Sequence, residues 1–160
     1  MKSVHFCFAT HNHQPIGNFD YVIEEAYEKS YLPFFKLAEK FNFRFATHFS
    51  GILLEWLSTH HPEHIAMLRR FSASGRLEMI SGGYYEPILA VFSEVDRQAQ
   101  IAKLSNFISD TIGTAPTGMW LAERIWEQQL AASIASAGMK YSILDDTHFR
   151  GAGLEAEDLN

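Results

Sequence analysis

The sequence predicts an α/β protein built on a parallel β-sheet. Short apolar runs alternate with longer amphipathic segments five times along the chain, and this alternation is typical of parallel strands joined by helical crossovers. The chain has 160 residues, of which 47% are hydrophobic, so one domain with a sizeable core is expected. We therefore expect about five β/α units, in either an open doubly wound sheet or part of a (β/α) barrel.

The apolar runs predict five strands, at residues 4–10, 43–48, 77–80, 118–121 and 141–144. The single cysteine, Cys7, lies within the first run, so we expect a buried structural thiol there. One cysteine also excludes an internal disulfide and a cysteine-based zinc cluster.

The amphipathic segments predict helices at residues 20–41, 51–58, 62–74, 93–112 and 128–137. Pro33 marks a break or a new start within the first helical region, and Gly138 ends the last helix. Ser93 is the expected N-cap of the clearest amphipathic helix. On or near its buried face we expect Val95, Ala99, Ala102, Phe107 and Ile108.

Titratable and aromatic residues follow all five predicted strands. The carboxyl ends of parallel strands meet at one edge of a sheet, so a single polar cleft is the economical interpretation. Its residues suit a sugar site, because carboxylates serve as acid, base or nucleophile, imidazoles and amides bind hydroxyls, and aromatic faces stack on pyranose rings. These residues include His11, Asn12, His48, Tyr85, Glu86, Trp120, Glu123, Asp145 and His148.

Four of these strand ends carry motifs that resemble glycoside hydrolase family 57, and in particular its 4-α-glucanotransferase and α-amylase branch. The motifs are HNHQP at 11–15, GYYEP at 83–87, WLAERIW at 120–126 and DDTHF at 145–149. The resemblance extends through most of the chain, including SGILLEW at 50–56. It implies a (β/α)7 barrel, in which residues 1–160 are the N-terminal part of a single catalytic domain whose C-terminal part is missing.

The resemblance also implies roles for individual residues. Glu123 matches the catalytic nucleophile of a retaining mechanism on α-1,4-glucans, either hydrolysis or 4-α-glucanosyl transfer. His13 and Glu86 match donor-subsite residues. Trp120 matches an aromatic residue of a family motif, and we expect its ring to stack on a sugar. His11 and Asp146 complete the expected substrate-binding set. No cofactor or metal is implied, and the family's acid/base aspartate belongs to a motif beyond residue 160.

The residues alone leave plainer interpretations open. Glu123 next to Arg124 also suits a surface ion pair, although a cation such as Arg124 would equally help to keep a nucleophile ionised. Glu86 suits a partner of a backbone amide near Gly82–Gly83. One of Asp145 and Asp146 is expected to cap the following helix, and Trp56 is expected in the core.

Two other functions remain possible from the sequence. His11 and His13 point to the same side of an extended segment, which suits a zinc site completed by Asp145, Asp146 or His148 in a carbohydrate deacetylase. A non-catalytic glucan-binding fragment is the other alternative. A second histidine group, His60, His61 and His64, is expected to be solvated in a loop.

Charge and hydropathy restrict the classes of molecule that the protein is expected to bind. The net charge of −6 and the pI near 5.7 disfavour nucleic acid and anionic membrane surfaces. No apolar run approaches the length of a membrane span, and no signal-peptide pattern is present, so a cytoplasmic protein acting on an α-glucan or maltooligosaccharide is expected. An incomplete barrel has an unpaired strand edge, which makes a homo-oligomer possible.

Overall fold

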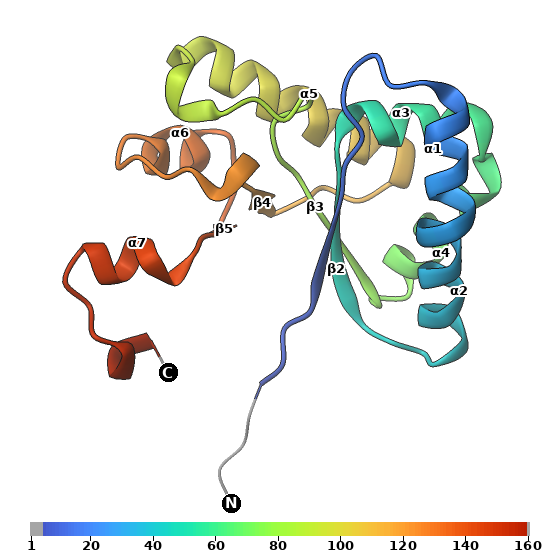
Figure 1. The fold of residues 1–160 in the computed structure, drawn as a ribbon, viewed down its shortest axis with the longest axis horizontal. Coiled ribbons are helices and arrows are strands. Elements are labelled where there is room, and N and C mark those ends of the chain that lie inside the picture. Colours follow the sequence, from blue (N-terminus) through green and yellow to red (C-terminus); the bar gives the residue numbers. More distant parts are fainter. Residues whose placement is uncertain (1–4, 160) are drawn as a thin grey trace, which may run out of the picture.

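The computed structural model describes residues 5–159, and its five strands are all parallel. They are β1 (Ala9–Asn12), β2 (Phe45–Phe49), β3 (Leu77–Ile80), β4 (Gly118–Trp120) and β5 (Tyr141–Ile143). β1, β2 and β3 form one sheet and β4 and β5 another, and a parallel bridge between Ser81 and Met119 joins β3 to β4 (Figure 1). The strands are therefore arranged in sequence order, as in the wall of a (β/α) barrel, and the predicted α/β fold with parallel strands is confirmed.

Helices follow the strands along the chain. The helices are α1 (Asp20–Ala26), η1 (Tyr27–Tyr31), α2 (Leu32–Lys40), α3 (Gly51–His60), α4 (Pro62–Ala73), α5 (Glu94–Ile112), α6 (Leu130–Ser136) and α7 (Asp146–Gly151), with short 3₁₀ turns η2 (Leu89–Val91), η3 (Ala122–Arg124) and η4 (Ala156–Leu159). Pro33 lies in the first turn of α2, directly after the π-helical segment η1. Because proline has no N–H and clashes with the carbonyl of the preceding turn, regular α-helical bonding is interrupted at this point.

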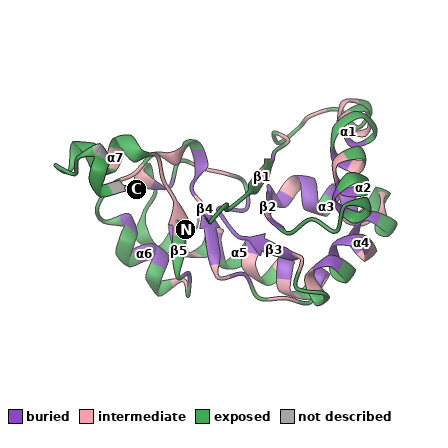
Figure 2. Ribbon diagram, turned by 90° about the horizontal axis from the view of Figure 1, so that it is seen from below, coloured by how far each residue is buried: buried purple, intermediate pink, exposed green. Residues whose placement is uncertain are grey.

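The buried residues, purple in Figure 2, include two hydrophobic clusters that hold the elements together. The larger one lies between β2 and β3 and the helices from α1 to α5, with Phe35, Phe49 and Leu53 completely buried. The smaller one includes Met119 of β4, Ile101 of α5 and Leu130 of α6. Trp56 belongs to the larger cluster, as expected, and its indole N–H donates to Asp20 at 3.0 Å.

The first strand begins later than predicted. Val4 lies outside the described residues, and β1 begins at Ala9, where pairing with Ala46 of β2 starts. Cys7 precedes this pairing and is exposed, so the prediction of a buried thiol is wrong. A strand is stabilised by its neighbours, and the apolar character of residues 5–8 does not by itself bury them.

Two further predictions about burial are wrong. In α5, Ile108 is buried and Phe107 packs against the larger cluster, as predicted, but Val95, Ala99 and Ala102 are exposed. The buried residues of this helix are Arg97, Ile101, Leu104, Ile108 and Ile112. His64, expected in solvent, is completely buried on α4 among aromatic rings. Both errors concern which face of a helix meets a neighbour, and neighbours are set by the tertiary arrangement.

None of the helices in the described part of the chain is both long and apolar enough to cross a membrane.

Candidate active site

A cleft of about 400 Å³ lies at the carboxyl ends of the strands. It is lined by residues at the ends of β1 and β4 and in the segments after β1, β3 and β4, including His11, His13, Glu86, Trp120, Glu123 and Arg124. Five of the six predicted site residues are therefore in one place. The sixth, Asp146, is the exposed first residue of α7 and does not line the cleft.

The pairing of β1 with β2 places two histidines side by side at the base of this cleft. His11 is in register with His48, and their Nδ1 atoms are 2.9 Å apart. The Asn12 side-chain amide donates to the His48 carbonyl and to the Thr47 hydroxyl, both at 2.9 Å, and so fastens the two strand ends together. The sequence placed His48 among the strand-end residues of the expected cleft but not in the predicted substrate-binding set, although the register of parallel strand ends is a signal that identifies it.

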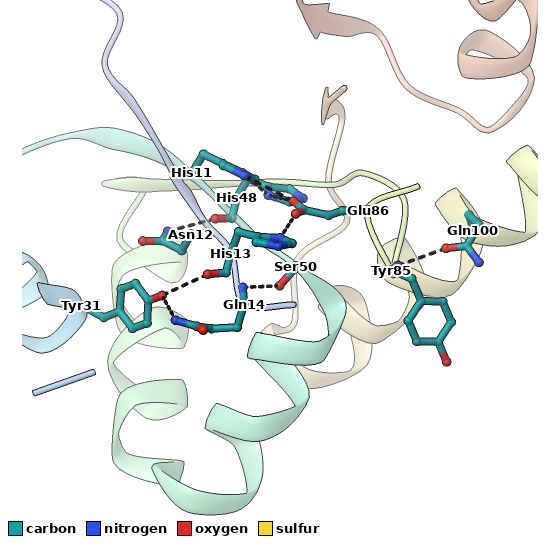
Figure 3. A network of polar contacts seen from close by, with 10 residues as sticks. All are labelled: His11, Asn12, His13, Gln14, Tyr31, His48, Ser50, Tyr85, Glu86 and Gln100. Atoms are coloured by element: carbon teal, nitrogen blue, oxygen red, sulfur yellow. Dashed lines mark hydrogen bonds and ion pairs between the residues drawn. The ribbon is translucent and has the colours of Figure 1, made fainter. Parts of the chain in front are cut away.

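Glu86 lies in the middle of three imidazoles (Figure 3). One carboxylate oxygen, Oε2, contacts His13 Nδ1. The other, Oε1, is 3.3 Å from His48 Nδ1 and 3.6 Å from His11 Nε2, and it is buried without a hydrogen-bond partner. Glu86 is thus surrounded by histidines and is not the partner of a backbone amide near Gly82–Gly83, the alternative left open by the sequence.

Burial controls the charge in this cluster. It raises the pKa of Glu86, an effect that the imidazole of His13 opposes and the carboxylate of Glu123 reinforces. Burial, with smaller contributions from His13 and Arg124, lowers the pKa of His11 to about 4. The pKa of His48 is well below its usual value, again mainly through burial. At neutral pH, His11 and His48 are therefore uncharged.

Trp120 forms the wall beside the histidines. Its indole ring stacks on the His11 imidazole with 4.4 Å between ring centroids and 18° between planes. Gly82 is required nearby, because a Cβ there would lie 2.8 Å from His48 Nε2 and 3.0 Å from the Trp120 carbonyl oxygen. This glycine allows the loop after β3 to approach β2 and β4 closely.

Glu123 is exposed in the turn that follows β4, and its backbone has φ 53° and ψ 7°. Arg124 has the same φ. Residues with side chains seldom adopt this left-handed conformation, and such strain is concentrated at functional sites. The Arg124 side chain does not bind Glu123 but donates from Nε to Asp145 Oδ1 at 2.7 Å.

The zinc ligands considered from the sequence are not assembled. Asp145 pairs with Arg124, and His148 Nε2 lies 2.8 Å from the Arg124 carbonyl oxygen. Asp145 is at the N-cap position of α7, as expected for one of the two aspartates, although its side chain makes no capping bond. In the described part of the chain, the group able to hold a metal is His11, His48 and Glu86.

Comparison with known proteins identifies the family of this chain. Residues 7–159 match the profile of a family described as Glycosyl hydrolase family 57. The chain belongs to this family. Two similar proteins are named for reactions of α-glucans. An α-amylase from Dictyoglomus thermophilum is 49% identical over 99% of the chain, and a 4-α-glucanotransferase from Thermococcus kodakarensis is 46% identical over 99%.

A solved family 57 structure has the same fold. The 4-α-glucanotransferase from Thermococcus litoralis superposes with a TM-score of 0.93 and 43% identity over 98% of the chain. The chain spans about a quarter of these proteins: 23% and 24% of the two relatives and 25% of the solved structure.

Proposed function

We propose that residues 1–160 are the N-terminal part of a single glycoside hydrolase barrel domain and contribute the nucleophile half of its active site. The substrate is an α-1,4-glucan or maltooligosaccharide. The relatives named for amylase and glucanotransferase activities support this substrate class. The five parallel strands in sequence order support the barrel, whose remaining strands are not among these residues.

In this proposal, Glu123 attacks the anomeric carbon of the donor sugar. The bond between that carbon and the Glu123 carboxylate oxygen forms as the glycosidic carbon–oxygen bond breaks, giving a covalent glycosyl-Glu123 intermediate. A carboxylic acid outside these residues protonates the departing oxygen. Water then releases the sugar in hydrolysis, or the 4-hydroxyl of a second glucan accepts it in transfer, with retention of configuration.

The observation that carries the proposal is the position of Glu123 at the same cleft as the sugar-binding residue types. The half-buried Trp120 ring offers an apolar surface for a pyranose face. His11, His13 and Glu86 offer hydrogen-bonding groups for sugar hydroxyls. A substrate-binding role for Asp146 and a cytoplasmic location remain predictions. None of these steps calls for a cofactor.

Binding of maltooligosaccharide tests the cleft. We expect Trp120→Ala and His13→Asn each to weaken binding about tenfold, equivalent to about 1.4 kcal/mol. Isothermal titration calorimetry of the folded variants measures the change. The matched control is Glu127→Gln, which removes an exposed carboxylate that does not line the cleft and should leave the affinity unchanged. Equal affinity of wild type and Trp120→Ala would contradict the proposal.

A further inference from the structure

We propose that His11, His48 and Glu86 form a binding site for one zinc-type divalent metal ion at the base of the cleft. The three residues each offer a ligand atom, and these atoms all lie within 4.8 Å of one another. The residues come from the ends of β1 and β2 and from the loop after β3, so the sheet itself fixes their relative positions.

The donor set and spacing fit zinc. Two imidazole nitrogens and one carboxylate oxygen are a known set for a three-ligand zinc site with an open fourth position. Zinc ligands at about 2.0–2.2 Å in tetrahedral geometry lie about 3.3–3.5 Å from each other. Glu86 Oε1 lies 3.3 Å from His48 Nδ1 and 3.6 Å from His11 Nε2, close to this spacing.

An unsatisfied oxygen supports the same position. Glu86 Oε1 is buried and has no hydrogen-bond partner, a costly state for a carboxylate oxygen. This is the oxygen that faces His11 and His48. A cation among these three groups would satisfy it. The His11 side chain is 29% exposed and lines the cleft, which leaves the ion a path from solvent.

The surroundings hold the ligands in place. His13 contacts the second oxygen of Glu86, the outer-shell arrangement that orients a metal-binding carboxylate (Figure 3). Asn12 holds the backbone of His48 through its carbonyl. His61 provides a contrast: it meets Glu24 and Glu63 through opposite ring nitrogens, so those three groups do not converge on one point.

Titration of Zn²⁺ into the metal-free chain, without any glucan, tests the proposal. We expect one ion per chain by calorimetry, and a visible Co²⁺ spectrum typical of tetrahedral coordination. Glu86→Gln and His11→Asn should each reduce the Zn²⁺ affinity at least 100-fold, and His13→Asn about 10–100-fold, as for other outer-shell partners. His61→Asn is the control and should bind as the wild type does. Mg²⁺, which prefers oxygen ligands, should not compete.

Thermal unfolding first establishes which variants are folded. If Glu86→Gln does not fold, the partly exposed His11→Asn decides the outcome. The proposal is overturned if the wild type shows no saturable Zn²⁺ binding, if folded His11→Asn or Glu86→Gln binds Zn²⁺ normally, or if His61→Asn removes the site. Because no sugar is present, these outcomes leave the proposed action on glucans to its own tests.

Discussion

At the scale of single residues, the two glutamates of the cleft share a left-handed backbone conformation. Glu86 has φ 52° and Glu123 has φ 53°, and each such position costs about 1–3 kcal/mol. Glu86 closes a tight turn in which its N–H donates to the Gly83 carbonyl at 2.9 Å. Both carboxylates are thereby directed to the cleft by turns at the ends of strands, so part of the stability of the domain is used to position them.

Sequence reasoning found most of the cleft because its residues lie directly after strands. Trp120, Glu86 and His13 were predicted from strand ends and from the family resemblance, and the cleft contains all three. His48 was named among the strand-end residues but given no specific role, because that role arises from its pairing with His11 across the sheet, and pairing is a property of the register. Arg124 pairs with Asp145, which follows β5. The sequence did not predict this pair, because Arg124 stands next to Glu123 in the chain and Glu123 was the expected partner.

The buried His64 predicts that the folded chain loses stability in acid. Burial lowers its pKa to about 4, a change that His61 reinforces and Glu63 opposes. Between pH 6.5 and 4 the unfolded chain binds a proton that the folded chain does not, so the free energy of unfolding falls as the pH falls. Over this pH range His64 lowers the free energy of unfolding by on the order of 3 kcal/mol.

His64→Leu should therefore flatten the loss of stability on acidification, with little change at pH 7, where the imidazole is neutral in both states. Urea unfolding between pH 7 and pH 4 measures the difference. His60→Gln, on the exposed end of α3, is the control and should keep the pH dependence of the wild type. Identical pH profiles for His64→Leu and the wild type would refute the assignment.

At the scale of elements, α5 illustrates what local sequence determines. Ser93 was predicted as its N-cap, and Ser93 Oγ accepts from the Asp96 N–H at 3.3 Å. Gly113, in the left-handed conformation with φ 87°, ends the helix. Caps depend on the adjacent residues alone, which explains why the boundaries were predictable. The buried face was predicted only in part, at Ile108, because it depends on packing against α3, α4 and α6.

Removal of the Ser93 cap is expected to lower the free energy of unfolding. Ser93→Ala should lower the free energy of unfolding by about 1 kcal/mol, because the Asp96 N–H loses its acceptor. Urea denaturation measures the change. Ser109→Ala is the matched control: it lies inside the same helix, its hydroxyl donates to the Ser105 carbonyl at 2.9 Å, and a smaller effect is expected. Equal costs for the two substitutions would show that the cap is not what Ser93 contributes.

At the scale of the whole molecule, the sequence predicted five parallel strands and an unpaired strand edge, while the order of the strands in the sheet was left open between two architectures. Within residues 5–159, β1 pairs with β2 and has no second neighbour. An unpaired edge of this kind is a template for association with another chain. We therefore predict that the chain self-associates in a concentration-dependent manner. Light scattering over a range of concentrations measures this, and a monodisperse monomer throughout would contradict the prediction.

The central claim is that Glu123 is the nucleophile of a retaining reaction on α-glucosides. The most direct test is intact-mass analysis after incubation with a 5-fluoro-α-glucosyl fluoride, followed by peptide mapping. Fluoride departs with little acid assistance, so a carboxylic acid outside these residues is not required for labelling. We predict one hexosyl adduct on Glu123, retained in Glu127→Gln and absent in Glu123→Gln. No adduct on the folded chain, or an adduct on another carboxylate such as Glu86, would contradict the account.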